Sequence, residues 1–398
     1  MVTRSIRTYL IAALATTWLA GCSSPSVEEL RSPVPESLVA TASLPGYSQI
    51  RFWGDDASGI SREAIAIAAD QAHAAAKTDP DIDPFDRKFL SVSGGGSDGA
   101  FGAGVLVGWS EAGRRPTFDI VTGISTGALI APFAFLGSSY DVKLREAYTE
   151  VTSKDLYRKK GILSIIGSES VADNTPLKAI VAGYVTDRLL ADIAREHAKG
   201  RRLLIGTTNI DAERPVIWDM GAIASSKQPG RKQLFQDILV ASASIPGIFP
   251  PVRLTVLADG RKYDELHVDG GTSNQAFLFP ANFSPQAVDK QLGGKRKRTL
   301  YVIRNSKVTP VWSAVKPRLA AIAGKSISSL IKTQGIGDLY RMYANARRDS
   351  VAFNAIWVPA SFEIKEKESF DQGYMRSLFK VGYDMGRNGI PWSHLPPG

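Results

Sequence analysis

The stretch from residue 88 to residue 136 constrains the fold of this chain more than any other part of its sequence. It holds two apolar segments of strand length, 89–92 and 118–121, and each leads into a turn and then a helix-length apolar segment. This repeated order predicts two neighbouring parallel strands. Strands and helices keep alternating along the rest of the chain, so we expect one α/β domain with a mainly parallel sheet and helices on both faces.

The turn after the first strand is rich in glycine. It reads Gly94, Gly95, Gly96, Ser97, Asp98 and Gly99. Because glycine has no Cβ atom, a turn of this kind at the start of a helix can present several backbone N–H groups to an anion. The sequence therefore predicts an anion-binding loop at this position.

The turn after the second strand has the G-x-S-x-G spacing of a nucleophile elbow, and it reads Gly123, Ile124, Ser125, Thr126 and Gly127. Flanking glycines relieve crowding at such a strained strand-to-helix turn and leave the serine hydroxyl accessible. The spacing alone is a weak signal in a chain with 36 glycines. Here a predicted strand precedes the motif and a predicted helix follows it, so we expect Ser125 to be a nucleophile.

A nucleophilic serine needs a group that takes its proton. The chain has four histidines. His73 and His197 lie in polar helical segments, His394 lies in a proline-rich C-terminal tail, and His267 lies in a predicted strand. None of them is singled out by its sequence context.

Asp269 is the more interesting candidate base. It ends the second strand of a predicted hairpin, 252–257 and 263–268, and is followed by Gly270 and Gly271. The sharp turn would present its carboxylate at the carboxyl end of a strand, where open α/β sheets place their sites. A plain Asp-Gly turn without a chemical role explains these residues equally well.

The three blocks, in this order, resemble the signature motifs of the patatin-like phospholipase family, and residues 241–251 resemble a further block of that family. The resemblance covers about residues 89–302. It implies a three-layer patatin-like fold and a Ser-Asp dyad that hydrolyses acyl esters of lipids with no metal and no cofactor. On this resemblance Ser125 is the nucleophile and Asp269 the base, and the backbone N–H groups of Gly95, Gly96 and Ser97 form the oxyanion hole.

Asp98 departs from the family pattern, which usually has Arg or Lys immediately before the last glycine of the first block. A cation there would help to hold a negative intermediate or a lipid phosphate, and an acid would not. The departure bears on headgroup preference more than on the reaction, because backbone N–H donors are unaffected.

Three other interpretations remain open. The first is an α/β-hydrolase of the general type in which a histidine assists, since Ser125, Asp269 and His394 follow the Ser, Asp, His order of that fold. The second is a dinucleotide-binding module, with Gly94, Gly96 and Gly99 as G-x-G-x-x-G and Asp119 as the ribose-binding acid. The third is a lipoprotein scaffold without catalytic activity.

The N-terminus predicts export. Arg4 and Arg7 precede a short apolar run that ends in Leu19, Ala20, Gly21 and Cys22, and this resembles the lipobox of a bacterial lipoprotein signal peptide. We expect a signal peptide over 1–21, a lipidated Cys22 with a flexible tether over 22–50, and a single hydrolase domain over 51–398. Ser23 after the cysteine favours the outer membrane. Cys22 is the only cysteine, so no disulfide is expected.

Positive charge is concentrated near the C-terminus. The chain carries a formal net charge of +9, and residues 295–348 contain thirteen Lys and Arg against one acid. A predicted helix over 317–332 has a broad apolar face with Arg318, Lys325 and Lys332 beside it at seven-residue intervals. It is either a surface helix packed on the sheet or an interfacial helix that draws the site onto anionic lipid. The export signal argues against nucleic acid as a partner, and the oligomeric state is not predicted.

Together these features predict an exported, lipid-anchored serine hydrolase that acts on membrane phospholipid or lysophospholipid.

Overall fold

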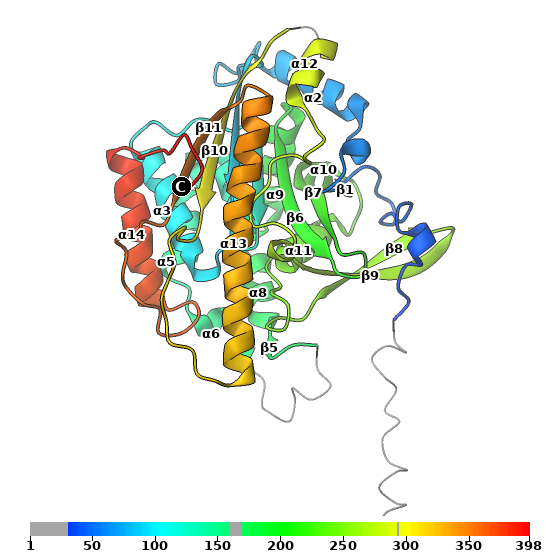
Figure 1. The fold of residues 1–398 in the computed structure, drawn as a ribbon. Helices are drawn as coiled ribbons and strands as arrows, with labels where there is room; N and C mark the ends of the chain where they lie inside the picture. The colour runs from blue at the N-terminus through cyan, green and yellow to red at the C-terminus, as the bar shows by residue number, and fades with distance from the viewer. Residues whose placement is uncertain (1–30, 160–168, 293) are drawn as a thin grey trace, which may run out of the picture.

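A computed structural model describes residues 31–159, 169–292 and 294–398 (Figure 1). The expected signal peptide, the lipidation site at Cys22 and the first part of the expected tether lie outside the described residues. Within them, a nine-stranded sheet forms the centre of the fold. Its strands are β1 Arg51–Trp53, β2 Asp86–Val92, β3 Ile120–Ile124, β6 Arg202–Asn209, β7 Arg214–Asp219, β8 Val252–Ala258, β9 Arg261–Asp269, β10 Lys297–Arg304 and β11 Ala352–Trp357.

The sheet is mixed rather than purely parallel. Strands β6, β3, β2, β10 and β11 are neighbours in that order and all run parallel, as expected from the alternation of strands and helices. Strands β7 and β1 extend the sheet antiparallel beyond β6, and the β8–β9 hairpin also pairs antiparallel with β6. The hairpin turns at Asp259 and Gly260, as the sequence predicts, because a two-residue loop can join only antiparallel strands.

Helices cover both faces of the sheet. They are α2 Arg62–Ala75, α3 Gly99–Glu111, α4 Thr126–Leu136, α5 Asp141–Thr149, α6 Ser153–Leu156, α8 Thr175–Tyr184, α9 Asp187–Ala198, α10 Met220–Ser225, α11 Arg231–Ser242, α12 Pro285–Leu292, α13 Leu319–Arg348 and α14 Gln372–Asn388, with a small pair of strands, β4 Arg158–Lys159 and β5 Ala172–Asp173. Alternate side chains of β2 point to opposite faces of the sheet. Leu90 and Val92 belong to the core under α3 and α14, and Phe89 belongs to a second core under α13. This alternation produces three layers, which confirms the expected α/β fold class.

Close packing of α3 against α14 fixes the helix that follows the first glycine turn. A Cβ atom on Gly104 would lie 2.1 Å from the Phe379 carbonyl oxygen, and one on Gly108 would lie 2.1 Å from the Tyr383 carbonyl oxygen. The two backbones therefore approach more closely than residues with side chains would permit. This contact holds α3 close against α14.

Residues 31–50 differ from the expected flexible tether. Arg31 forms ion pairs with Asp211 and Asp264, and Ser43 pairs with Leu257 at the edge of β8. Leu44 is buried against the main core. The polar and proline-rich composition of this segment hid these contacts, because their partners lie more than 150 residues away in the chain.

Helix α13 is longer than predicted, and its two halves have different surroundings (Figure 1). Its C-terminal half packs on the sheet through Leu339, Met342 and Ala346. The apolar residues of its N-terminal half do not pack on the sheet. They are 37–86% exposed, and they are Leu319, Ile322, Ile327, Leu330 and Ile331. No helix among the described residues is long and apolar enough to cross a bilayer.

Candidate active site

Ser125 lies at the junction of β3 and α4, in the turn that the G-x-S-x-G spacing predicts. Its backbone φ of +55° is a strained conformation for a residue with a side chain. The turn is also tight: a Cβ on Gly123 would lie 2.3 Å from the Gly127 carbonyl oxygen, and one on Gly127 would lie 2.2 Å from the Val92 carbonyl oxygen. Ser125 N–H donates to the Ser242 hydroxyl at 3.0 Å, which secures the strained residue.

The register of β6 brings Asp269 next to this turn. β3 and β9 pair with the same edge of β6, one after the other along its length. Ile124, the last residue of β3, pairs with Gly206, and Asp269, the last residue of β9, pairs with Thr207. The residue that follows Ile124 therefore meets the residue that ends β9. The Ser125 side chain lies next to the Asp269 carboxyl group and lowers its pKa.

Burial controls the protonation of Asp269, which is 5% exposed. Desolvation raises the pKa of its carboxyl group to about 7, and hydrogen bonds from the Ser125 hydroxyl and the Gly271 N–H oppose that rise. The Gly271 N–H donates at 2.6 Å, and a Cβ on Gly271 would lie 2.9 Å from a carboxyl oxygen of Asp269. The glycines after Asp269 thus let the backbone approach the carboxylate and orient it. A carboxylate with a pKa near neutrality is a better proton acceptor than an ordinary aspartate.

The glycine loop lies directly beside Ser125. A Cβ on Gly94 would lie 3.2 Å from the Cβ of Ser125. The N–H groups of Gly95, Gly96 and Ser97 have no hydrogen-bond acceptor among the described residues, as expected for the first turn of a helix. Gly96 has a φ of +56° and open space around its Cα, so this part of the loop faces a free volume. Three backbone donors therefore stand next to a serine hydroxyl.

Gly99 and Thr126, the first residues of α3 and α4, are in close contact. A Cβ on Gly99 would lie 2.1 Å from the Thr126 hydroxyl, which in turn hydrogen-bonds with the Tyr148 hydroxyl at 2.7 Å. Both helix N-termini, with their partial positive charge, thus face the same region. This arrangement favours negative charge at the site.

Four polar residues that the sequence did not single out hold the loops in place. Asn305 accepts the Gly102 N–H at 3.0 Å and binds the backbone of Ser93, and a Cβ on Gly95 would collide with its carbonyl oxygen. The Gln275 backbone carbonyl accepts the Gly94 N–H, and its side chain donates to the Gly271 carbonyl at 2.9 Å. The other two are Ser242, described above, and Asp338 of α13, which accepts the Gln275 N–H at 2.6 Å. Most of their partners lie far away in sequence, so no local motif marks them.

Asp98 occupies the position where the family motif usually has a cation. Its carboxylate accepts a hydrogen bond from the Tyr374 hydroxyl, and burial raises its pKa to about 6. The hydrogen bond from Tyr374 and the charges of Lys307 and Arg304 lower that pKa, and Glu366 raises it. Cations from other elements therefore lie near this loop, although the motif itself lacks one.

The cations Arg304 and Lys307 also lie near Lys332 of α13. Arg304 donates to the Lys332 carbonyl at 3.2 Å, and Arg304, Lys307 and Asp98 all influence the pKa of Lys332, which burial lowers. Gln334 donates to the Ser273 carbonyl just after the Asp-Gly-Gly turn. The exposed apolar part of α13 therefore begins immediately beside the site. Of the three predicted basic positions, Lys332 donates to the Thr309 carbonyl, and Lys325 contacts the 311–313 loop.

The histidines do not reach Ser125. His267 is fully buried, and its ring nitrogens bind Thr207 at 2.9 Å and Glu265 at 3.0 Å. His394 contacts the Phe353 carbonyl near the start of β11, at the opposite end of the parallel strands from Ser125. A histidine-assisted triad through His394 therefore does not form in this structure.

Asp119 does not have the position of a ribose-binding acid. It precedes β3, at the opposite end from the glycine loop, and forms an ion pair with Arg87 at 3.1 Å. It also accepts the Lys88 N–H at 2.6 Å. These contacts give Asp119 a structural role, and they remove the support for a dinucleotide-binding site. No cluster of three or more potential metal-ligating side chains occurs among the described residues.

Comparisons with known proteins agree with the sequence resemblance. The family model described as patatin-like phospholipase matches residues 90–281. No curated protein gives a match.

Three solved structures share partial similarity with the chain. VipD from Legionella pneumophila is 12% identical over 77% of this chain and 66% of its own, with a TM-score of 0.32. Human GIVD cytosolic phospholipase A2 is 9% identical over 79% and 53%, with a TM-score of 0.32. ExoU from Pseudomonas aeruginosa, solved with SpcU, is 12% identical over 76% and 52%, with a TM-score of 0.30. The chain thus spans about half to two thirds of the length of these proteins.

Proposed function

We propose that the protein is a lipid acyl hydrolase that cleaves fatty-acyl esters of membrane phospholipids or lysophospholipids through a Ser125–Asp269 dyad, and the match of residues 90–281 to the patatin-like phospholipase family model supports this. One observation carries this proposal. The Ser125 side chain lies next to a buried carboxyl group, and the glycine loop beside it has three backbone N–H groups with no acceptor among the described residues.

The first half of the reaction forms an acyl-enzyme. Asp269 takes the proton from the Ser125 hydroxyl as the oxygen attacks the acyl carbonyl carbon. The N–H groups of Gly95, Gly96 and Ser97 then stabilise the negative oxygen of the tetrahedral intermediate, a contribution that typically amounts to ~10² to 10³ in rate for each donor. When the ester bond breaks, Asp269 returns the proton to the leaving alcohol.

The second half releases the fatty acid. A water molecule takes the place of the alcohol, and Asp269 accepts a proton from it as it attacks the acyl carbonyl. The same N–H groups hold the second oxyanion, and the proton passes back to the Ser125 oxygen as the acyl bond breaks. Each proton moves between the two groups of the dyad and the reacting oxygen, so no histidine is required.

Substrate reaches this site from a lipid surface in our proposal. The exposed apolar residues of the N-terminal half of α13 end at Ile331, three residues before Gln334, which contacts Ser273 after the Asp-Gly-Gly turn, and Trp312, in the loop before the helix, is 85% exposed. Arg318, Lys325 and Lys332 lie along the same stretch and complement anionic headgroups. This arrangement is typical of a surface that inserts apolar side chains among lipids while cations remain at the headgroups.

We further propose that Cys22 carries a lipid and anchors the enzyme to a cell membrane, most simply the outer membrane. Only the sequence supports this part. An anchored enzyme needs no high intrinsic affinity for the surface, because the anchor keeps its local concentration near the lipid high.

The test is covalent labelling by a fluorophosphonate with an alkyl chain, which modifies an activated serine. We expect the purified full-length chain to be labelled at Ser125 and the Ser125→Ala variant to remain unlabelled. Ser139→Ala, which removes an exposed serine on the loop after α4, is the matched control and should be labelled like the wild type. Equal labelling of wild type and Ser125→Ala would refute the assignment of the nucleophile.

A further inference from the structure

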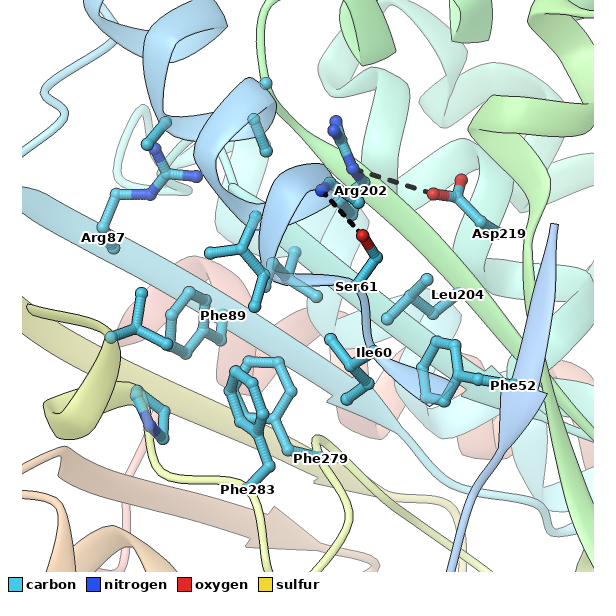
Figure 2. Close-up of a pocket in the computed structure, with 18 of the residues that line it drawn as sticks. Phe52, Ile60, Ser61, Arg87, Phe89, Arg202, Leu204, Asp219, Phe279 and Phe283 are labelled. Atoms are coloured by element: carbon cyan, nitrogen blue, oxygen red, sulfur yellow. Dashed lines mark hydrogen bonds and ion pairs between the residues drawn. The ribbon is translucent and has the colours of Figure 1, made fainter. Parts of the chain in front are cut away.

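A cavity of about 220 Å³ lies between the sheet and α2, away from Ser125 (Figure 2). Ile120, the first residue of β3, lines it, whereas Ser125 follows the last residue of the same strand. Five strand residues at about 3.3 Å each separate the two places by roughly 17 Å. The cavity is therefore distinct from the proposed active site.

The wall of the cavity is mostly apolar and partly open to solvent. The ring of Phe279 lies 5.9 Å from that of Phe89 and 4.7 Å from that of Phe283, and together these rings form one side (Figure 2). Phe52 and Ile60 face them from β1 and the segment before α2. All of these side chains except Phe89 are half-buried, so the cavity opens at the surface. An apolar wall with an entrance can accept a hydrocarbon chain.

Positive charge exceeds negative charge along the cavity. Five arginines line it, and four carboxylates form ion pairs with them. The pairs are Arg51 with Glu265, Arg87 with Asp119, Arg202 with Asp219, and both Arg296 and Arg298 with Asp289. One guanidinium charge is therefore left over in this group. Burial of an uncompensated charge is unfavourable, and a bound monoanion would relieve it.

Arg87 has hydrogen-bond donors available for such an anion. Its side chain is 13% exposed, and its Nε lies 3.1 Å from Asp119. Neither of its Nη groups has an acceptor among the described residues. A guanidinium group with free Nη donors binds a carboxylate through parallel hydrogen bonds. The Arg87 end of the cavity is thus suited to a carboxylate.

We propose that this cavity binds a free fatty acid of medium chain length, with its carboxylate on Arg87 and its chain along Phe89, Phe279 and Phe283. The volume sets the size of the ligand: an apolar cavity of about 150 Å³ holds benzene, so this one holds a single chain and not a whole phospholipid. A fatty acid is also the acid product of the proposed hydrolysis. Binding here, however, does not depend on that function.

The experiment is isothermal titration calorimetry of the purified full-length chain with sodium decanoate below its critical micelle concentration. Ala64→Phe, which fills the cavity from α2, should abolish the binding, and Ala74→Phe, on the exposed face of the same helix, should leave it intact. Arg87→Lys keeps the positive charge beside Asp119 but lacks the two coplanar Nη donors of a guanidinium group. It should weaken binding of decanoate about tenfold.

Two ligand controls define the chemistry. Decanol should bind at least about tenfold more weakly than decanoate, because it lacks the charge, and decyltrimethylammonium should not bind. Decanoate binding that is unchanged in both Ala64→Phe and Arg87→Lys, or that is equalled by decanol, would overturn the proposal. Ester hydrolysis by Ala64→Phe, measured in parallel, separates a failure of this site from a failure of the proposed active site.

Discussion

Replacing Asp269 by Asn tests whether the carboxylate is held in a site of low polarity. Burial raises its pKa from 3.8 to about 7, which corresponds to roughly 4 kcal/mol of unfavourable free energy for the ionised form in the folded protein. Asparagine has nearly the same shape and can still accept the Gly271 N–H. We therefore expect Asp269→Asn to be more stable than the wild type at pH 8, with an upper bound of about 4 kcal/mol.

The sign of this effect depends on pH. The folded state holds the Asp269 proton up to about pH 7, whereas the unfolded chain releases it near pH 3.8. Between these values the folded state binds more protons, so the contribution of this group to stability falls as pH rises and is lost above pH 7. At pH 4 or below, the wild type and Asp269→Asn should have nearly equal stability, and the difference should grow from pH 4 to pH 8.

The assay is urea unfolding of both proteins at pH 4, 6 and 8. Asp259→Asn, in the exposed β8–β9 turn, is the matched control and should show no such growth with pH. Asp269→Asn should also lose ester hydrolysis by at least ~10²-fold, because the base is gone. A stability difference that does not change with pH would refute the reasoning, since the carboxylate would then titrate normally in the folded protein.

Three further results follow from the same structure. Hydrolysis of a soluble aryl ester should decline as pH falls through about 7, since only ionised Asp269 accepts the serine proton; a flat rate from pH 5 to 9 would contradict this. His394→Ala should keep wild-type kcat/KM, and complete loss of activity would restore a histidine triad. Leu319→Asp combined with Leu330→Asp should reduce binding to anionic vesicles at least about tenfold while aryl ester hydrolysis continues. Val142→Asp, an equally polar change at an exposed valine of α5, should bind vesicles normally.

The sequence allowed the parts of the site that depend on local backbone chemistry to be predicted. Ser125 between Gly123 and Gly127 follows from the steric demands of a strand-to-helix turn, and the unpaired N–H groups of the glycine loop follow from the start of a helix. The meeting of Ser125 with Asp269 required the resemblance to a family. The register that joins them belongs to β6, which carries no motif.

Features that arise from distant contacts were not predictable. Asn305 and Gln275 hold the glycine loop through hydrogen bonds to residues about 180 or more positions away. The split of α13 into a packed half and an exposed half depends on where the helix passes the edge of the sheet, and its apolar pattern is similar throughout. The excess positive charge along the cavity likewise emerges only when separate ion pairs are brought together there.

The most direct test of the central claim is release of free fatty acid from mixed phospholipid vesicles by the purified protein and by Ser125→Ala. The vesicles should contain zwitterionic and anionic lipid, and Ser139→Ala should accompany the assay as the matched serine control. Our account predicts release by the wild type and Ser139→Ala, and a loss of at least ~10³-fold in Ser125→Ala. Release that persists in Ser125→Ala, or no release of fatty acid by any of the three proteins, would contradict it.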